Sequence, residues 1–154
     1  MSDLNPRSTL QIAGHPIHPM AVKFPIAFFI AAFVCDLLFL RSGHAGWAVA
    51  SQWLLGAGLA IALVAAAGGL IDFLGDRRIR ALADAWRHMI GNIILVAVEA
   101  LNFYLRCRDG AGVIAPYGVI LSGIGVALLL FTAFMGGQLV FRHRVGVADR
   151  SDSA

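Results

Sequence analysis

Four long apolar stretches divide the chain, and short polar segments separate them. The apolar stretches cover about residues 20–40, 47–74, 89–105 and 113–141. A helix rises about 1.5 Å per residue, so each stretch can cross the roughly 30 Å of hydrocarbon in a bilayer. The intervening segments are residues 41–46, 75–88 and 106–112. Because short connections make consecutive helices antiparallel neighbours, the pattern predicts an all-α integral membrane protein, a four-helix up-down-up-down bundle.

Polar segments frame this bundle at both ends. We expect an N-terminal segment over residues 1–19, the bundle over residues 20–145, and a polar tail over residues 146–154. The first apolar stretch follows about twenty polar or mixed residues and is longer than the apolar core of a signal peptide, so we expect it to stay in the protein.

The composition supports a membrane environment. Of 154 residues, 59% are hydrophobic and 14% are charged, whereas a soluble domain is roughly one quarter charged. A soluble fold of this length could not bury so much apolar surface in one core. The apolar side chains must therefore face lipid.

The positive charges fall unevenly on the two sides of the predicted bundle. The net charge is +3, and nine of the twelve Lys and Arg residues lie on one side: Arg7, Lys23, Arg77, Arg78, Arg80, Arg87, Arg142, Arg144 and Arg150. The other side has Arg41, Arg106 and Arg108. Cytoplasmic loops carry the excess of Lys and Arg, so we expect a multi-pass protein of the bacterial inner membrane with both termini in the cytoplasm. The arginines lie between apolar segments and not in one basic run. This placement indicates that they set the membrane topology and do not bind nucleic acid.

Small residues indicate how the helices pack. The fourth apolar stretch has three pairs spaced four apart: Gly118 with Ser122, Gly123 with Ala127, and Thr132 with Gly136. This spacing lets helix backbones approach closely in lipid. We expect it to serve packing inside the monomer, and a homodimer interface is the alternative. For Cys35 and Cys107 we expect two unpaired thiols, because a disulfide needs a strict separation of the two backbones.

A stripe of polar residues runs along the third apolar stretch. It comprises His88, Asn92, Glu99, Asn102 and Arg106, at steps of 4, 7, 3 and 4 residues. Residues at this spacing share one helix face, which in a bundle is turned toward the neighbouring helices. Glu99 lies near mid-bilayer, where an ionisable group suggests a function such as a proton relay. The alternative is a neutral Glu99 that is hydrogen-bonded to a neighbouring helix.

The N-terminal segment contains two histidines in the sequence Gly14-His15-Pro16-Ile17-His18-Pro19-Met20. Proline disfavours the helical conformation for the residue before it, so His15 and His18 should both be extended. In a polyproline-like segment, residues three apart lie on the same side, about 9 Å apart. The two imidazoles can thus point together toward the bundle. Pro25 should bend the first helix.

Five potential ligands map to the predicted cytoplasmic end of the bundle: His15, His18, Asp72, His88 and His143. Ligands that converge from separate helices are typical of a cofactor site at a bundle end, and imidazole suits Zn, Cu, Fe or haem iron. Glycines at the same level would leave a slot for a flat ring, and arginines, Arg87 and Arg142 among them, would meet haem propionates. The alternative is a hydrogen-bonded polar cluster without a cofactor. These residues do not distinguish a site for haem b from a site for a bare transition metal.

Several motifs resemble an uncharacterised family of bacterial four-helix inner-membrane proteins, a domain of unknown function. The similar segments are Gly14-His15-Pro16-Ile17-His18-Pro19-Met20 with Val22 and Phe24-Pro25-Ile26, then Gly69-Leu70-Ile71-Asp72-Phe73, His88 with Asn92, and Gly136-Gly137-Gln138-Leu139-Val140-Phe141-Arg142-His143-Arg144-Val145-Gly146-Val147. The family often has Tyr at the position of Phe141. The resemblance covers nearly the whole chain and implies the four-span fold. Some relatives are fused to, or encoded near, Rieske-type iron–sulfur domains, which implies redox work.

Three functional hypotheses follow. The first is a small redox protein with haem b or a transition metal (Fe, Cu or Zn) at His15, His18, His88 and His143, with Asp72 as a fifth ligand or an orienting acceptor. Asn92, Glu99 and Asn102 would then carry protons or fill the bundle interior. The second is a cofactor-free accessory or assembly subunit of a larger, respiratory-type membrane complex. The third is a small transporter or proton pathway, although no inverted repeat is visible. No phosphate loop, nucleophile elbow or His-Glu-x-x-His motif is present, so we do not expect a stand-alone enzyme.

Overall fold

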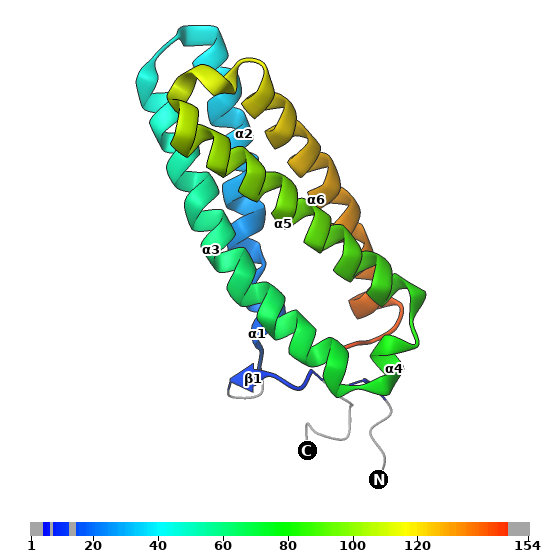
Figure 1. The fold of residues 1–154 in the computed structure, drawn as a ribbon. Coiled ribbons are helices and arrows are strands. Elements are labelled where there is room, and N and C mark those ends of the chain that lie inside the picture. The colour runs from blue at the N-terminus through cyan, green and yellow to red at the C-terminus, as the bar shows by residue number, and fades with distance from the viewer. Residues whose placement is uncertain (1–4, 7, 13–14, 148–154) are drawn as a thin grey trace.

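Four long helices follow one another along the chain, and each runs antiparallel to the one before it (Figure 1). They are α2 (Lys23–Ser42), α3 (Ala45–Gly75), α5 (Ala83–Asp109) and α6 (Tyr117–Phe141). This computed structural model describes residues 5–6, 8–12 and 15–147, without the side chains of His15 and Pro16, and most of the polar tail lies outside that range. All four spans are long and apolar enough to cross a membrane. The prediction of an all-α membrane bundle is therefore confirmed.

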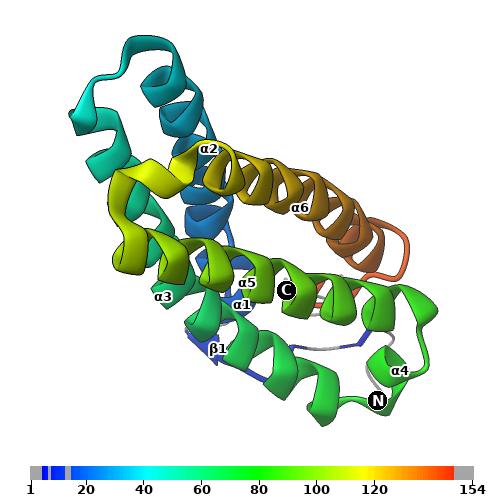
Figure 2. The same ribbon diagram turned by 45° about the horizontal axis from the view of Figure 1, so that its top comes forward.

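Short elements connect and extend the long helices. They are β1 (Gln11–Ile12), β2 (His15–Pro16), α1 (Ile17–Ala21), α4 (Arg77–Arg80) and the 3-10 helix η1 (Gly110–Ile114). The two strands pair antiparallel, Gln11 with Pro16 and Ile12 with His15. In both views α5 runs beside α6 and α2 beside α3 (Figure 2). Short connections thus make consecutive long helices neighbours, as expected.

The first span is interrupted where Pro25 removes a hydrogen bond. Pro25 has no N–H to donate to the carbonyl of Ala21, and α1 ends at Ala21 while α2 begins at Lys23. Bonds from Val22 N to His18 O (3.1 Å) and from Ile26 N to Val22 O (3.2 Å) keep the two helices continuous. The interruption lies one turn before the proline. His18 lies inside α1, so the expected extended conformation was wrong for His18, while His15 is extended in β2.

The third span is longer than its hydropathy suggested. α5 begins at Ala83 and ends at Asp109, whereas the sequence predicted residues 89–105. Charged residues near both helix ends lower the local hydropathy without ending the helix, because their side chains find partners. His88 and Arg106 consequently lie inside α5 and not in its connections.

Apolar side chains fill the middle of the bundle. The central cluster contains Phe29, Ala32, Leu55, Ala62, Leu95 and Leu129. Gly58 allows close packing there, since a Cβ at this position would lie 2.7 Å from the Phe29 ring. The outer surface carries many exposed apolar side chains, which a bilayer covers. At one end, Gly146 N donates to Pro6 O (2.8 Å), so the two ends of the described chain meet.

Candidate functional site

Two of the predicted ligands, His18 and His88, meet at one end of the bundle. We call the end that contains His18, His88 and His143 the His end. His18 comes from α1 and His88 from the second turn of α5, and their ring centroids are 6.0 Å apart with planes at 87°. A Cβ at Gly69 would lie 3.0 Å from the His18 ring, and one at Gly136 would lie 3.0 Å from the His88 ring. The imidazoles themselves therefore pack where these two glycines leave room.

Backbone carbonyls orient both imidazoles. His18 Nδ1 lies 2.7 Å from Ala65 O, and His88 Nδ1 lies 2.9 Å from Thr132 O. A carbonyl only accepts, so each Nδ1 carries a proton, and in the neutral ring Nε2 has the lone pair. Asn92 Nδ2 donates to His88 Nε2 (3.2 Å) and to His88 O (2.8 Å). Both rings are thus held in the tautomer that ligates through Nε2.

The remaining predicted ligands lie apart from this pair. His143 Nε2 is 3.0 Å from Asp84 Oδ2, and Arg87 donates to Asp84 Oδ1 at 3.1 Å. Arg142 is exposed at the end of α6. Of His15 only the backbone, in β2, is described. Among the residues with described positions, no three His, Cys, Asp or Glu side chains gather closely enough to hold a metal ion.

Asp72 binds the N-terminal segment. Its carboxylate accepts hydrogen bonds from Ser8 Oγ (2.9 Å), Thr9 N (2.7 Å) and Leu10 N (3.0 Å). A carboxylate that accepts three such bonds near the end of α3 is a fixed anchor for the chain that leads to His18.

A buried polar network fills the interior near the opposite end, which we call the Arg106 end. The network consists of Asp36, Ser51, Glu99, Asn102, Arg106 and Ser122, and all six residues are buried. Arg106 donates to both oxygens of Asp36, from NH1 to Oδ1 at 2.7 Å and from NH2 to Oδ2 at 2.6 Å. This arrangement is a two-pronged ion pair, which is the strong form of an arginine–carboxylate contact.

The other members of the buried network complete the coordination of the guanidinium. Arg106 Nε donates to Asn102 Oδ1 (3.0 Å), and NH1 and NH2 also donate to Ser51 Oγ (2.7 Å) and Ser122 Oγ (3.2 Å). Ser122 in turn donates to Asp36 Oδ2 at 2.7 Å. All three nitrogens of the guanidinium are therefore hydrogen-bonded to protein groups.

Glu99 is joined to this network by a single hydrogen bond. Its Oε2 accepts from Asn102 Nδ2 at 3.2 Å. Its Oε1 is buried and has no hydrogen-bond partner among the described residues. Gly125 on α6 provides the space, because a Cβ at that position would overlap Oε1.

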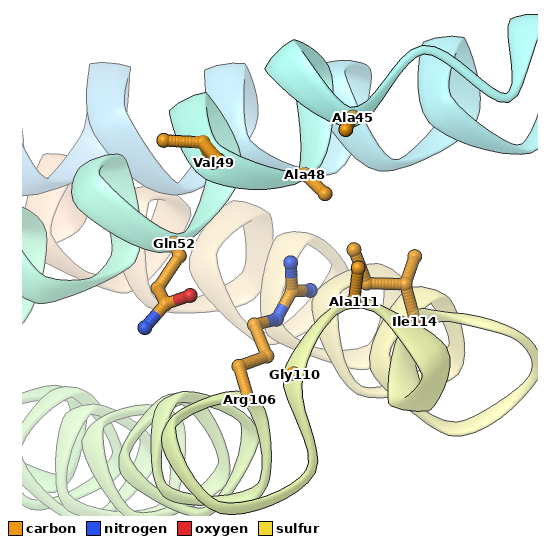
Figure 3. Close-up of a pocket in the computed structure, with 8 residues that line it drawn as sticks. All are labelled: Ala45, Ala48, Val49, Gln52, Arg106, Gly110, Ala111 and Ile114. Atoms are coloured by element: carbon orange, nitrogen blue, oxygen red, sulfur yellow. The ribbon is translucent and has the colours of Figure 1, made fainter.

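A small cavity lies beside Arg106 at its end of the bundle (Figure 3). Its volume is about 120 Å³, and its lining includes Ala48, Gln52, Arg106, Ala111 and Ile114. Arg106 extends from α5 toward α3 (Figure 3). Arg106 therefore belongs both to the buried network and to the wall of this cavity.

Comparison with known proteins places the chain in a family. The family model described as "Predicted membrane protein (DUF2231)" matches residues 14–149. The chain belongs to this family. No curated protein and no solved structure matches it. DUF2231 membership and the four apolar helices establish a multi-pass membrane protein whose outer surface contacts lipid.

Sequence reasoning found only part of the buried network of this DUF2231 protein. It placed Glu99 and Asn102 on an inward-facing stripe, and both are buried. It placed Arg106 on the same stripe, which agrees with its burial, but also counted it among the loop charges, whereas Arg106 forms a buried ion pair with Asp36. It did not single out Asp36 or Ser51. The available signal was Asp36 itself, a carboxylate inside an apolar stretch that requires a buried cation.

Proposed function

We propose that this protein is a small redox protein of the bacterial inner membrane that binds haem b or a transition metal between His18 and His88. The observation that carries the proposal is the orientation of the two rings. Each Nδ1 is fixed on a backbone carbonyl, as in imidazoles that ligate metals through Nε2.

The spacing of the two rings supports the same proposal. A metal–nitrogen bond of about 2 Å would place two imidazoles on one ion with ring centroids roughly 5–6.5 Å apart, a range that includes the 6.0 Å between His18 and His88. His18 and His88 would be the two protein ligands of a haem iron, whereas a bare Zn, Cu or Fe ion would need further donors. His15, three residues before His18, is the candidate for a third donor. Asn92 would release His88 Nε2 and keep its bond to His88 O.

The ligand type suggests electron transfer. Bound iron or copper would supply a one-electron couple, and the protein would set its potential through the carbonyl-bound imidazoles and the partly apolar surroundings. The excess of Lys and Arg at the His end supports a cytoplasmic position for the site. Its partner would then be a redox protein or a larger respiratory-type complex on that side.

Spectroscopy and metal analysis of detergent-purified protein test the proposal. A Soret band that is lost in both His18→Ala and His88→Ala supports haem b. A stoichiometric metal without a Soret band, lost in the same variants, supports a bare metal centre. His44→Ala at the Arg106 end is the matched control and should retain the cofactor. Wild-type protein with neither a chromophore nor a metal overturns the proposal and favours a cofactor-free accessory subunit.

A further inference from the structure

The charges of the buried network are balanced without Glu99. Asp36 and Arg106 are 0% and 2% exposed and neutralise each other in a two-pronged ion pair. Glu99 is also 0% exposed and lies ten residues before the end of α5, about 15 Å inside the span. An ionised Glu99 would add an uncompensated negative charge within the hydrocarbon layer, which is costly.

The contacts of Glu99 provide too few donors to stabilise a buried carboxylate. A buried carboxylate normally accepts several short hydrogen bonds, whereas Glu99 accepts one, at 3.2 Å, and its Oε1 accepts none. The guanidinium of Arg106 donates to other groups and not to Glu99. The charged groups that face this region are Asp36 from α2 and Arg106 from α5 itself. The packed parts of α3 and α6 contribute Ser51, Ser122 and Gly125, none of which titrates.

We propose that Glu99 carries a proton, so that the buried network is a proton-binding site. This site exchanges its proton with the solvent at the Arg106 end. Asn102 and Ser122 connect Glu99 to the Asp36–Arg106 pair, and Arg106 lines the cavity of about 120 Å³. Because the Asn102 amide donates to both Glu99 and Ser122, it cannot relay the proton itself, and exchange would use water that enters past these polar groups from the cavity.

The opposite direction is closed by apolar packing. The next polar residue of α5 toward the His end is Asn92, seven residues away, or about 10 Å. Leu95 lies between them, buried at 4% exposure in the cluster with Phe29 and Leu129. The proton site therefore works independently of the His18–His88 pair and does not depend on the proposed cofactor.

A single isotope label tests the proposal, because Glu99 is the only glutamate in the chain. Cell-free synthesis of the full chain with δ-¹³C glutamate, followed by reconstitution in bilayers, gives one labelled carboxyl group for infrared or NMR spectroscopy. We expect the signal of a protonated acid at neutral pH, with the carboxylate signal growing as the pH is raised. A carboxylate signal at neutral pH overturns the proposal, and this wild-type measurement needs no variant.

Asp36→Asn tests the charge balance directly. Removal of the Asp36 charge leaves Arg106 without a counter-ion, so Glu99 should lose its proton and show a carboxylate signal at neutral pH. Asp72→Asn, at the other end, is the matched control and should leave the acid signal unchanged. An acid signal that persists in Asp36→Asn overturns the charge-balance argument.

The rate of hydrogen–deuterium exchange at the labelled acid tests the route. Ala111→Trp, which fills the cavity beside Arg106, should slow the exchange, while Ala81→Trp, on the exposed turn at the His end, should not. Slowing by Ala81→Trp, or equal rates in both variants, overturns the proposed access from the Arg106 end.

Discussion

Asp36 and Arg106 neutralise each other's charge inside the bundle, so the loss of either side chain leaves a buried, unpaired charge. Their side chains are 0% and 1% exposed. Removing one partner of a buried pair leaves the other charge uncompensated and costs about 3–5 kcal/mol. We expect Arg106→Met to lower the free energy of unfolding by that amount in detergent micelles, measured by denaturant titration.

A surface pair and a double variant serve as controls for this prediction. Arg108 forms an exposed ion pair with Asp109, so Arg108→Met should leave the stability nearly unchanged. Replacing both buried charges, with Asp36→Leu and Arg106→Met together, should recover much of the loss. Equal effects of Arg106→Met and Arg108→Met would contradict the burial of the pair.

Gly125 makes room for the Glu99 carboxyl group. A Cβ at residue 125 would overlap Oε1, and Glu99 is fully buried. We expect Gly125→Ala to destabilise the protein by about 1–3 kcal/mol, as overpacking usually does. Thermal unfolding in micelles measures the change.

Gly123 provides the matched control, two residues earlier on the same helix. A Cβ there would lie 3.5 Å from the Phe33 ring, an ordinary contact distance. Gly123→Ala should therefore be neutral or slightly stabilising, because alanine favours the helix over glycine. If both alanine variants had the same stability, the close packing of Glu99 on Gly125 would be refuted.

At the scale of elements, Asp72 links the N-terminal segment to the last turns of α3. Its bonds to Thr9 N and Leu10 N hold the chain that leads through β1 and β2 to α1. A hydrogen bond to a charged group contributes about 1.5–3 kcal/mol. Asp72→Ala should therefore speed amide hydrogen exchange at Thr9 and Leu10 by roughly tenfold to a hundredfold, as observed by mass spectrometry of exchanged peptides.

The control for this prediction is a carboxylate at the opposite end. Asp109 pairs with Arg108 at the Arg106 end of the bundle, away from the N-terminal segment. Asp109→Ala should leave the exchange at Thr9 and Leu10 unchanged. Unaltered exchange in Asp72→Ala itself would show that other contacts hold the segment.

The sequence predicted the elements better than it predicted their partners. Hydropathy locates a span because each apolar stretch reports its own environment. The stripe on α5 also followed from its spacing, and Glu99 and Asn102 are buried as expected. Asp72 shows the limit, since its place near the end of α3 was evident but its partners, Ser8 to Leu10, are more than sixty residues away.

At the scale of the whole molecule, one apolar layer separates two polar regions. The His18–His88 pair lies on one side of the cluster around Leu95, and the buried network lies on the other. Local spacing could not show this division, because His88, Asn92, Glu99 and Arg106 share one stripe in the sequence. Their separation depends on the residues that other helices bring to each level, such as Asp36 from α2 and Thr132 from α6.

The burial of Arg106 sharpens the prediction of membrane orientation. Arg106 is a buried partner of Asp36 and no longer counts as a loop charge, so only Arg41 and Arg108 remain at its end. Nine of the twelve Lys and Arg residues still belong to the His end by sequence. Since Lys and Arg are retained on the cytoplasmic side, we expect the His end to face the cytoplasm.

Cysteine labelling in spheroplasts measures this orientation. In a Cys107→Ser background, with Cys35 buried, Ser42→Cys reports the Arg106 end and Ala81→Cys reports the His end. A membrane-impermeant thiol reagent should label Ser42→Cys in intact spheroplasts and Ala81→Cys only after permeabilisation. Both positions are exposed and lie at opposite ends of the bundle, so each variant is the control for the other. The reverse pattern would place the His18–His88 pair outside the cytoplasm and would exclude a cytoplasmic electron partner.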